Sequence, residues 1–269
     1  MTKVIGVIAI KGGVGKTTIA SSLATDLVNH YGKKVLLVDG NYSAPNLGIH
    51  MDIVNPEKTV HDVLAGKARI QTAAVNKFGV DVVAGSHIYH GSINPLKLKD
   101  KINKIKENYD FVIIDSSPAL NEEVLSVMQA SDNLLVVTTP DYPTLIGSLR
   151  AAIMAKQRGK PISGMILNKI RDPKYELTMD EIEGATEIPI VARIPDDKNT
   201  NRALFTKIPV SIYNRNSNFS KEISKLSAAL TNNSVKKGFW RSFLGMDFKR
   251  EEMNRELLKE SFYTSVIRD

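Results

Sequence analysis

The sequence predicts an α/β fold, a mostly parallel, twisted sheet with helices on both faces. Short runs of Val, Ile and Leu alternate along the chain with longer stretches in which apolar residues recur at helical spacing. Parallel strands are buried on both faces, so they form continuous apolar runs, and helical crossovers connect them. The predicted strands are Val4–Ile10, Val35–Asp39, Val80–Ala84, Phe111–Asp115, Leu134–Thr139, Ile162–Asn168 and Ile190–Ile194. Ligands of such sheets bind at the carboxyl ends of the strands.

The chain divides into one large domain and a short tail. Apolar residues make up 42% and charged residues 24% of the 269 residues, which is ordinary for a protein with a full core. Residues 1–230 contain no internal repeat and no Pro/Gly-rich linker, so we expect a single domain there. The polar stretch Thr231–Ser234 is typical of a hinge. Residues 231–269 are therefore expected to form a hinge and an amphipathic helical tail.

Composition excludes several classes of protein. The absence of cysteine excludes disulfides, thiolate metal sites and Cys nucleophiles, and it suits a reducing cytoplasm. No run approaches the roughly 20 apolar residues of a transmembrane helix, and the apolar run Val4–Ile10 is too short for a signal peptide. The net charge of +7 favours an anionic partner, either nucleic acid or acidic lipid, without choosing between them.

A glycine-rich segment follows the first predicted strand. Its glycines let successive backbone N–H groups face phosphate oxygens, and the next helix adds its positive N-terminal end. Lys16 would neutralise the β- and γ-phosphates, and the Thr17 hydroxyl would bind Mg²⁺. A chance Gly-rich turn is the alternative, but strand, loop and a helix with apolar periodicity occur here in the expected order. The segment consists of Lys11, Gly12, Gly13, Val14, Gly15, Lys16, Thr17 and Thr18.

This segment departs from the ordinary phosphate-binding motif at two positions. Ile10 stands where the first glycine is usual, and Lys11 is an additional lysine. The segment resembles the deviant Walker A motif of the MinD/ParA family of ATPases, and later landmarks recur in the family's order over nearly the whole chain. The resemblance implies a P-loop NTPase fold, ATP and Mg²⁺ as ligands, and a homodimer that forms on ATP binding. It also implies that Lys11 acts with Lys16 in catalysis, by reaching the nucleotide bound to the partner.

Two predicted strands end in an aspartate. Asp115 follows four apolar residues, and an aspartate there can hold Mg²⁺ through water, which is the Walker B role; the alternative is a residue that only caps the next turn. Asp39 begins a segment that resembles the family's first switch region, where it would stand near the Mg²⁺ shell. The predicted metal site is therefore Thr17, Asp39 and Asp115.

The switch segment differs from the family at Asn41. Family members place a second aspartate at this position, where it orients the attacking water, and this chain has an amide instead. An amide oxygen can accept a hydrogen bond from water, but it cannot act as a carboxylate base. Phosphoryl transfer depends mainly on positioning and electrostatics, so we expect a slow ATPase, with a nearly inactive nucleotide switch as the alternative.

Two further segments match the family's contacts with the nucleotide base. Asn168 ends a predicted strand, and the matching Asn of the family hydrogen-bonds adenine. Pro195 and Asp196 resemble the family's Ile-Pro-Glu/Asp turn beside the same ring. Such pairs are also common turn material, so their order after the phosphate-binding segment is what favours the nucleotide interpretation.

The tail begins with aromatic and basic residues. When the segment is drawn as a helix, the aromatic residues cluster together and the basic residues surround them. Bulky aromatic residues surrounded by basic ones are typical of a helix that lies in a lipid interface, and the segment resembles the C-terminal membrane-targeting sequence of MinD proteins. A helix that docks on its own domain is the alternative. The predicted membrane-binding residues are Lys236, Lys237, Phe239, Trp240, Arg241, Phe243 and Leu244.

The chain continues beyond the point where MinD proteins usually end. Residues Glu251–Arg268 combine near-helical apolar spacing with mixed charge, which predicts a second amphipathic helix. This helix could cover the aromatic face, pair with a partner or extend the dimer, and the sequence does not distinguish these possibilities.

The prediction is a cytoplasmic, reversibly membrane-associated ATPase of the MinD type. It would position a cellular machine such as the division site, with an unidentified activating or cargo protein. The rival is a ParA-type ATPase that binds DNA without sequence preference, supported by net charge and by lysines that are also typical of a solvated helix face. These lysines are Lys97, Lys99, Lys101, Lys104 and Lys106. An iron–sulphur carrier of the Mrp type is excluded because such carriers hold their clusters through cysteines.

Overall fold

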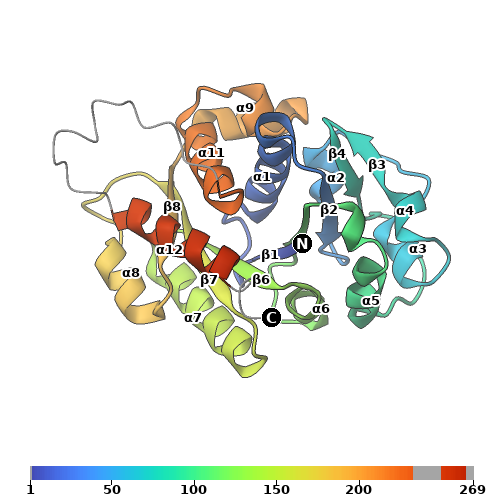
Figure 1. Cartoon of the computed structure of the whole chain (residues 1–269), viewed down its shortest axis with the longest axis horizontal. Coiled ribbons are helices and arrows are strands. Elements are labelled where there is room, and N and C mark those ends of the chain that lie inside the picture. Colours follow the sequence, from blue (N-terminus) through green and yellow to red (C-terminus); the bar gives the residue numbers. More distant parts are fainter. Residues whose placement is uncertain (1, 233–249, 265–269) are drawn as a thin grey trace.

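A computed structural model describes residues 2–232 and 250–264, with side chains described up to residue 259. An eight-stranded sheet crosses the molecule in the order β3-β4-β2-β5-β1-β6-β7-β8 (Figure 1). Only β3 runs antiparallel to its neighbour. The strands are β1 Lys3–Ile8, β2 Val35–Gly40, β3 Val75–Lys77, β4 Val80–Val83, β5 Phe111–Ser116, β6 Asn133–Thr138, β7 Ile162–Ile170 and β8 Ile190–Pro195.

Helices cover both faces of the sheet, each over its own buried apolar cluster. In Figure 1, α1, α9 and α11 lie above the sheet and α5, α6, α7 and α8 below it. The helices are α1 Lys16–Tyr31, α2 Leu47–His50, α3 Val60–Leu64, α4 Ile70–Ala73, α5 Leu98–Asn103, α6 Glu122–Ala130, α7 Tyr142–Gln157, α8 Met179–Thr186, α9 Lys198–Thr206, α10 Val210–Tyr213, α11 Asn218–Leu230 and α12 Arg250–Thr264.

The predicted fold class is confirmed, and each predicted strand forms within a few residues of its expected bounds. The first strand ends at Ile8 rather than Ile10, because the chain already turns there into the glycine-rich loop. The sequence did not predict β3. This strand has only three residues, two of them exposed, so it lacks the apolar run by which the other strands are recognised.

The register of the sheet brings the landmark residues together. β1 lies between β5 and β6, and β5 lies between β1 and β2. Asp39 of β2 stands directly opposite Asp115 of β5. Because these strands are parallel, their carboxyl ends meet at one edge of the sheet, beside the loop between β1 and α1.

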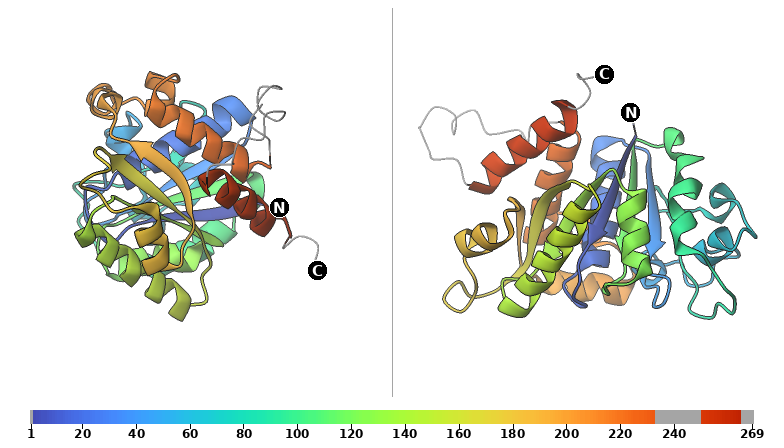
Figure 2. Two further views of the ribbon diagram at one scale, coloured as in Figure 1. Left: turned by 90° about the vertical axis from the view of Figure 1, so that its left-hand side faces the viewer. Right: turned by 90° about the horizontal axis from the view of Figure 1, so that it is seen from below.

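The predicted helix in the C-terminal extension forms as α12, and it packs on its own domain against β8 and α11. Figure 2 shows α12 on the side of the molecule where β1 begins. Asn254 Nδ2 donates to the Ile190 carbonyl at 2.8 Å, and Arg255 donates to the Val191 carbonyl at 2.9 Å. Leu258 is buried beside them.

The apolar residues of α12 do not share one buried face, as the sequence pattern suggested. Met253 and Leu257 point outward, with 51% and 58% of their surfaces exposed. The reason lies in β8, which is the last strand of the sheet. The outer carbonyls of an edge strand need hydrogen-bond donors, and the polar side of α12 supplies them.

Two parts of the predicted tail have different outcomes. The membrane-binding residues predicted between Lys236 and Leu244 lie outside the described residues. The division into residues 1–230 and 231–269 stays a prediction, although α12 of the second range packs on the first. Within residues 2–232 and 250–264, the structure contains no helix long and apolar enough to cross a membrane.

Candidate functional site

A cavity of about 520 Å³ opens at the carboxyl edge of the sheet, where the strand register predicted a ligand site. The glycine-rich loop and the start of α1 form one wall. Asn41 and the loop after β5 form a second wall, and the ends of β7 and β8 form a third. The predicted residues that line it are Gly12, Gly13, Gly15, Lys16, Thr17, Thr18, Asn41, Asn168, Pro195 and Asp196.

The end of β7 fixes the shape of the glycine-rich loop. Asn168 Nδ2 donates to the Val14 carbonyl at 2.7 Å, and Lys169 Nζ donates to the Gly13 carbonyl at 2.7 Å. Gly15 has φ of +98°, and a Cβ there would lie 2.3 Å from Asn168 Nδ2. Only glycine therefore fits at position 15 without moving Asn168, and the two hydrogen bonds hold the loop in this conformation.

Lys16, Thr17 and Asp115 form a polar cluster beside the glycine-rich loop, at what we call the phosphate end of the cavity. Lys16 and Thr17 line the cavity, whereas Asp115 contacts Thr17 without lining it. Thr17 Oγ1 donates to Asp115 Oδ2 at 2.6 Å. Asp115 Oδ1 is buried and accepts no hydrogen bond from the described residues. Lys16 is also mostly buried; burial lowers its pKa, and the charge of Asp115 counteracts this. A buried cation beside N–H groups at a helix N-terminus is suited to bind phosphate.

The same cluster fits a magnesium ion. The described residues contain no group of three or more His, Cys, Asp or Glu side chains that could hold a metal, so a site made only of such ligands is absent from them. Mg²⁺ is usually bound by one or two protein oxygens together with water and phosphate oxygens. The Thr17 hydroxyl and Asp115 Oδ1, which is buried and accepts no hydrogen bond from the described residues, are such oxygens. Burial raises the pKa of Asp115 to about 6, and an adjacent cation would favour its ionised form.

Asp39 lies close to this cluster but does not line the cavity. Its carboxylate accepts backbone N–H bonds from Asn41 at 3.0 Å and from Leu47 at 3.2 Å. Burial, and then the nearby charge of Asp115, raises the pKa of Asp39 to about 8. In this structure Asp39 therefore holds the loop that follows β2, and its expected place near the Mg²⁺ shell stays a prediction.

Asn41 lines the cavity on the side of Ser116 and Pro118. Its side-chain nitrogen donates to the Ala44 carbonyl at 2.5 Å, which closes the loop on itself. The amide is buried, with 9% of the residue exposed. The residue expected to replace the switch aspartate thus lines the same cavity as Lys16 and Thr17, and its role with water stays a prediction.

The ends of β7 and β8 bring Asn168 to the same cavity as Pro195 and Asp196, which lie more than twenty residues later in the sequence. Asp196 forms an ion pair with Arg171 at 2.7 Å. Sequence reasoning missed several lining residues because most come from helices and loops without a motif. These residues are Asn46, Ile49, His50, Ser116, Pro118, Lys169, Asp197, Thr200, Asn201, Leu204 and Phe219.

Lys11 and Val14 border a neighbouring cavity of about 310 Å³ instead. Lys11 Nζ lies 4.0 Å from Asp141 Oδ1, at the start of α7. Asp141 caps that helix by accepting the Thr144 N–H at 2.9 Å. Within its own chain, the additional lysine therefore points away from the nucleotide-sized cavity.

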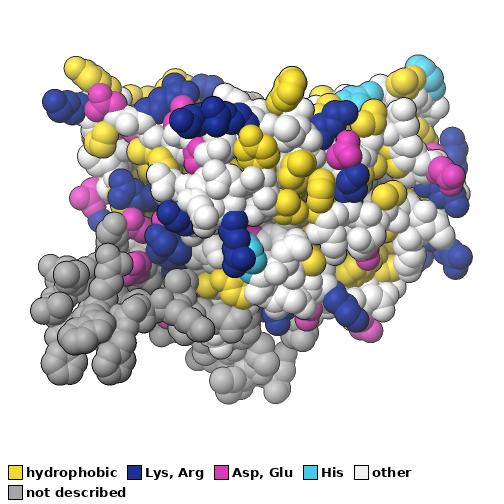
Figure 3. All heavy atoms as spheres, turned by 90° about the horizontal axis from the view of Figure 1, so that it is seen from above, with side chains coloured by type: hydrophobic (Ala, Val, Ile, Leu, Met, Phe, Trp, Pro, Cys, Tyr) yellow, Lys and Arg dark blue, Asp and Glu magenta, His cyan; other side chains and the backbone are white. Residues whose placement is uncertain are grey.

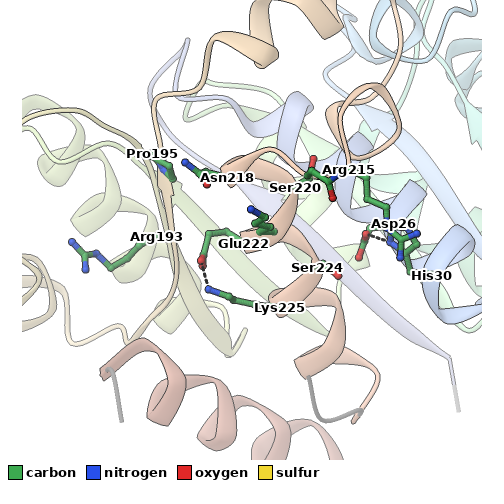
Figure 4. Close-up of a pocket in the computed structure, with 12 residues that line it drawn as sticks. Asp26, His30, Arg193, Pro195, Arg215, Asn218, Ser220, Glu222, Ser224 and Lys225 are labelled. Carbon is green, nitrogen blue, oxygen red and sulfur yellow. Dashed lines mark hydrogen bonds and ion pairs between the residues drawn. The ribbon is translucent and has the colours of Figure 1, made fainter. Parts of the chain in front are cut away.

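A third cavity, of about 510 Å³, lies between α1, α11 and the end of β8 (Figure 4). Some of its charges are already paired: Lys225 contacts Glu222 at 2.5 Å, and His30 contacts Asp26. On the face formed by α1, α9 and α11, basic side chains are interspersed with acidic and apolar ones (Figure 3). The basic residues that line the cavity are His30, Arg193, Arg215, Lys221 and Lys225.

Comparison with known proteins agrees with this geometry. A family model described as an AAA domain matches residues 2–158. An uncharacterized ATP-binding protein of Methanocaldococcus jannaschii is 32% identical over 96% of this chain and 94% of its own length. The septum site-determining protein MinD of Thermotoga maritima is 30% identical over 87% of this chain and 90% of its own length.

Solved structures give the same result. The cell division ATPase MinD of Pyrococcus furiosus superposes with a TM-score of 0.82 at 30% identity, over 86% of this chain and 99% of its own. MinD of Pyrococcus horikoshii, solved with Mg-ADP, gives a TM-score of 0.80 at 29% identity, over 84% and 95% of the two chains. The glycine-rich loop, the Thr17–Asp115 pair and these relatives lead to the same conclusion. The chain belongs to the MinD/ParA family of P-loop ATPases.

Proposed function

We propose that this protein is a MinD-like ATPase that binds Mg-ATP, dimerises on ATP and associates reversibly with a membrane to position a cellular machine such as the division site. The observation that carries the proposal is the cluster of Lys16, Thr17 and Asp115 beneath the glycine-rich loop. Mg-ADP bound to the similar Pyrococcus horikoshii MinD supports the same ligand class.

Each residue of the cluster has one role in this proposal. Lys16 neutralises the β- and γ-phosphates, while the loop's N–H groups bind phosphate oxygens. Mg²⁺ neutralises charge that develops on the phosphates, and Thr17 and Asp115 hold it directly or through water. Asn168, Pro195 and Asp196 line the same cavity and would border the base.

Dimerisation is supported by the position of Lys11. This lysine lies outside the cavity of its own chain, at the surface and beside the start of α7. A lysine placed there would be available to a phosphate bound in a facing subunit, in the manner of an arginine finger supplied in trans. ATP would then favour the dimer, because the added charge on the γ-phosphate attracts the partner's Lys11.

Slow hydrolysis is supported by Asn41, which stands where the family has an aspartate. Its side-chain nitrogen is occupied by Ala44, and its oxygen can accept a hydrogen bond from water but cannot take a proton at neutral pH. The hydrolytic step then depends on electrostatics and on the orientation of water alone.

Membrane association rests on the aromatic and basic residues between Lys236 and Leu244. In the sequence, these residues lie between α11 and α12. Each basic residue contributes about 1 kcal/mol near an acidic surface, and the aromatic residues supply apolar area. Two such segments in a dimer raise the effective concentration at the membrane, so dimerisation and membrane binding reinforce each other.

Sedimentation with anionic liposomes, in ATP and in ADP, tests the proposal. Binding should be stronger with ATP and should disappear when residues 236–244 are deleted, a change that retains α12. Trp240→Glu should weaken binding far more than Lys101→Glu, which changes a basic residue on α5. Equal binding by the parent protein and by the deletion variant would contradict a membrane role for this segment.

DNA binding is the alternative outcome of the same experiment. If liposomes are ignored in both nucleotide states while duplex DNA is bound with ATP, the ParA-type function replaces the MinD-type one. Binding through the lysines of residues 97–106 should then fall steeply with salt and be weakened by Lys101→Glu. These lysines are exposed or half-buried, as a solvated face would also require.

A further inference from the structure

The first turn of α6 lies between two loops that border the phosphate end of the nucleotide cavity. Residues 41–46 follow β2 and include Asn41, and residues 117–121 follow β5. Both loops contribute residues to the cavity wall. The helix lies this close to the end of β2 because Gly40 has no side chain: a Cβ there would come within 2.6 Å of Val127 Cγ2.

Glu123 joins α6 to the first of these loops. Its Oε1 accepts the backbone N–H of Ser43 at 2.9 Å and also the Ser43 hydroxyl. Glu123 is 7% exposed, whereas Ser43 lies at the surface. One turn later, the Ser126 hydroxyl lies 3.3 Å from the Tyr42 hydroxyl. Two consecutive residues of the loop thus contact one face of α6.

The same turn of α6 also holds the second loop. Asn121 Oδ1 accepts the N–H groups of Glu123 at 3.1 Å and Val124 at 3.2 Å, which caps the helix. It also accepts the Ser117 hydroxyl at 3.1 Å, two residues after Asp115. The hydrogen bonds of Glu123 and Asn121 therefore connect the loop of Asn41 with the loop that follows the predicted Mg²⁺ ligand.

Glu123 itself does not line the cavity, and its second oxygen, Oε2, is buried without a hydrogen bond from the described residues. Within the same part of the chain, its side chain accepts hydrogen bonds from Ser43 alone. A buried carboxylate that makes only this contact has a cost in desolvation, which a simple surface capping residue would avoid. The contact with the loop is therefore what distinguishes Glu123 from an ordinary acidic residue in a first helical turn.

We propose that Glu123 is a positioning residue for ATP hydrolysis, which holds residues 41–46 in place through Ser43 so that Asn41 faces the phosphate end of the cavity. The inference rests on the proposed ATPase function for its kinetic consequence. Misplacement of a positioning group by about 1 Å can slow a reaction roughly a hundredfold. The two hydrogen bonds that Glu123 accepts from Ser43 oppose such a shift of the loop.

The test compares Glu123→Ala with Glu122→Ala. Glu122 is in the same helical turn and carries the same charge, but it is exposed, and its side chain makes no hydrogen bond or ion pair with the described residues of the loop. Glu123→Ala should lower kcat for ATP about tenfold while the Kd for ATP changes less than about twofold. Glu122→Ala should change neither. Glu123→Gln keeps an acceptor oxygen for Ser43 and should recover most of the lost rate.

Hydrogen–deuterium exchange provides a readout that does not need catalysis. Glu123→Ala should accelerate exchange in a peptide that covers residues 41–46, and Glu122→Ala should leave it unchanged. Unchanged exchange in Glu123→Ala overturns the proposal, and so does faster exchange with an unaltered kcat. If the parent protein binds ATP without hydrolysing it, the proposed ATPase function fails, and the exchange measurement still tests the contact between Glu123 and the loop. Faster exchange in Glu123→Ala would then support that Glu123 holds residues 41–46, without a role in hydrolysis. Unchanged exchange in Glu123→Ala would overturn that contact's role too.

Discussion

The side-chain nitrogen of Lys11 lies 4.0 Å from Oδ1 of Asp141, the residue that caps α7. Both side chains are about half exposed, at 50% and 46%. An ion pair this exposed contributes at most about 1 kcal/mol. Lys11 is thus held weakly on its own subunit, and it can leave Asp141 at little cost when a partner offers a phosphate.

Lys11→Ala should leave ATP binding by the monomer largely intact and prevent ATP-dependent dimerisation. The reason is that Lys11 lies outside its own nucleotide cavity. Light scattering with a slowly hydrolysed ATP analogue measures the dimer. Asp141→Asn is the matched variant, because an amide oxygen can still cap α7 while the charge that attracts Lys11 is lost. This variant should dimerise as well as the parent or a few-fold more tightly, and normal dimerisation of Lys11→Ala would exclude the role in trans.

Lys16→Ala should weaken Mg-ATP binding by about 3 kcal/mol or more, roughly a hundredfold, because it removes the buried cation from the phosphate site. Isothermal titration calorimetry measures the affinity. Lys34→Ala removes an exposed lysine outside the nucleotide cavity and should bind ATP like the parent. Equal affinity in the two variants would falsify the phosphate assignment.

Asn41→Asp should raise the steady-state rate of ATP hydrolysis several-fold with little change in ATP affinity. A carboxylate can accept a proton from the attacking water, which the amide cannot do. The aspartate would also lose the bond that the Asn41 amide donates to Ala44, so a thermal unfolding curve is the control for loop damage. A folded variant no faster than the parent would place the attacking water elsewhere, or make dimerisation the slow step.

Gly15→Ala should abolish nucleotide binding, since the positive φ is unfavourable for alanine and the new Cβ would meet Asn168 Nδ2. Gly184→Ala is the opposite case within the same protein. Gly184 lies inside α8, where a Cβ would have no described neighbour within 4 Å beyond the helix's own backbone. The substitution should therefore stabilise the fold by about 1 kcal/mol, because alanine favours the helix over glycine. Urea denaturation and ATP titration of both variants separate the two effects, and ATP binding by Gly15→Ala would contradict the close approach of Asn168.

Stability should fall as the pH drops from about 6.5 to about 4, in part because of His50. Burial lowers the pKa of His50 from 6.5 to about 4. Between these values the unfolded chain binds a proton that the folded protein does not, so acid favours unfolding. His50→Gln should reduce the loss of unfolding free energy between pH 7 and pH 5, measured by urea denaturation. An identical loss in parent and variant would show that other groups dominate this window.

Much of the fold and the phosphate end of the site could be predicted from short stretches of sequence. Each buried parallel strand carries its own apolar run. Lys16 and Thr17 follow closely spaced glycines, a pattern that is specific to phosphate-binding loops. Asp115 could be predicted to lie near Thr17 because it ends an apolar run. The carboxyl end of a parallel strand lies at the edge of the sheet where the glycine-rich loop begins. These features are local, so a single sequence contains them in full.

The remaining features depend on contacts between distant segments. Phe219 and His50 enter the cavity from α11 and α2, and nothing in their neighbouring residues indicates a ligand. Asp39 follows the family pattern, yet its carboxylate is taken up by the N–H groups of a loop whose path no local pattern predicts. The outward position of Leu257 likewise depends on α12 meeting an edge strand with its polar side.

The contact of α12 with β8 has a consequence for how the protein behaves in solution. The outermost strand of a sheet offers its free backbone groups to strands of other molecules, which promotes aggregation. Asn254 and Arg255 occupy two of these groups on β8. A shortened protein that ends after α11 would expose them again, together with the apolar surface beneath Leu258. Such a fragment should self-associate at concentrations at which the full chain stays dispersed, whether or not it binds nucleotide.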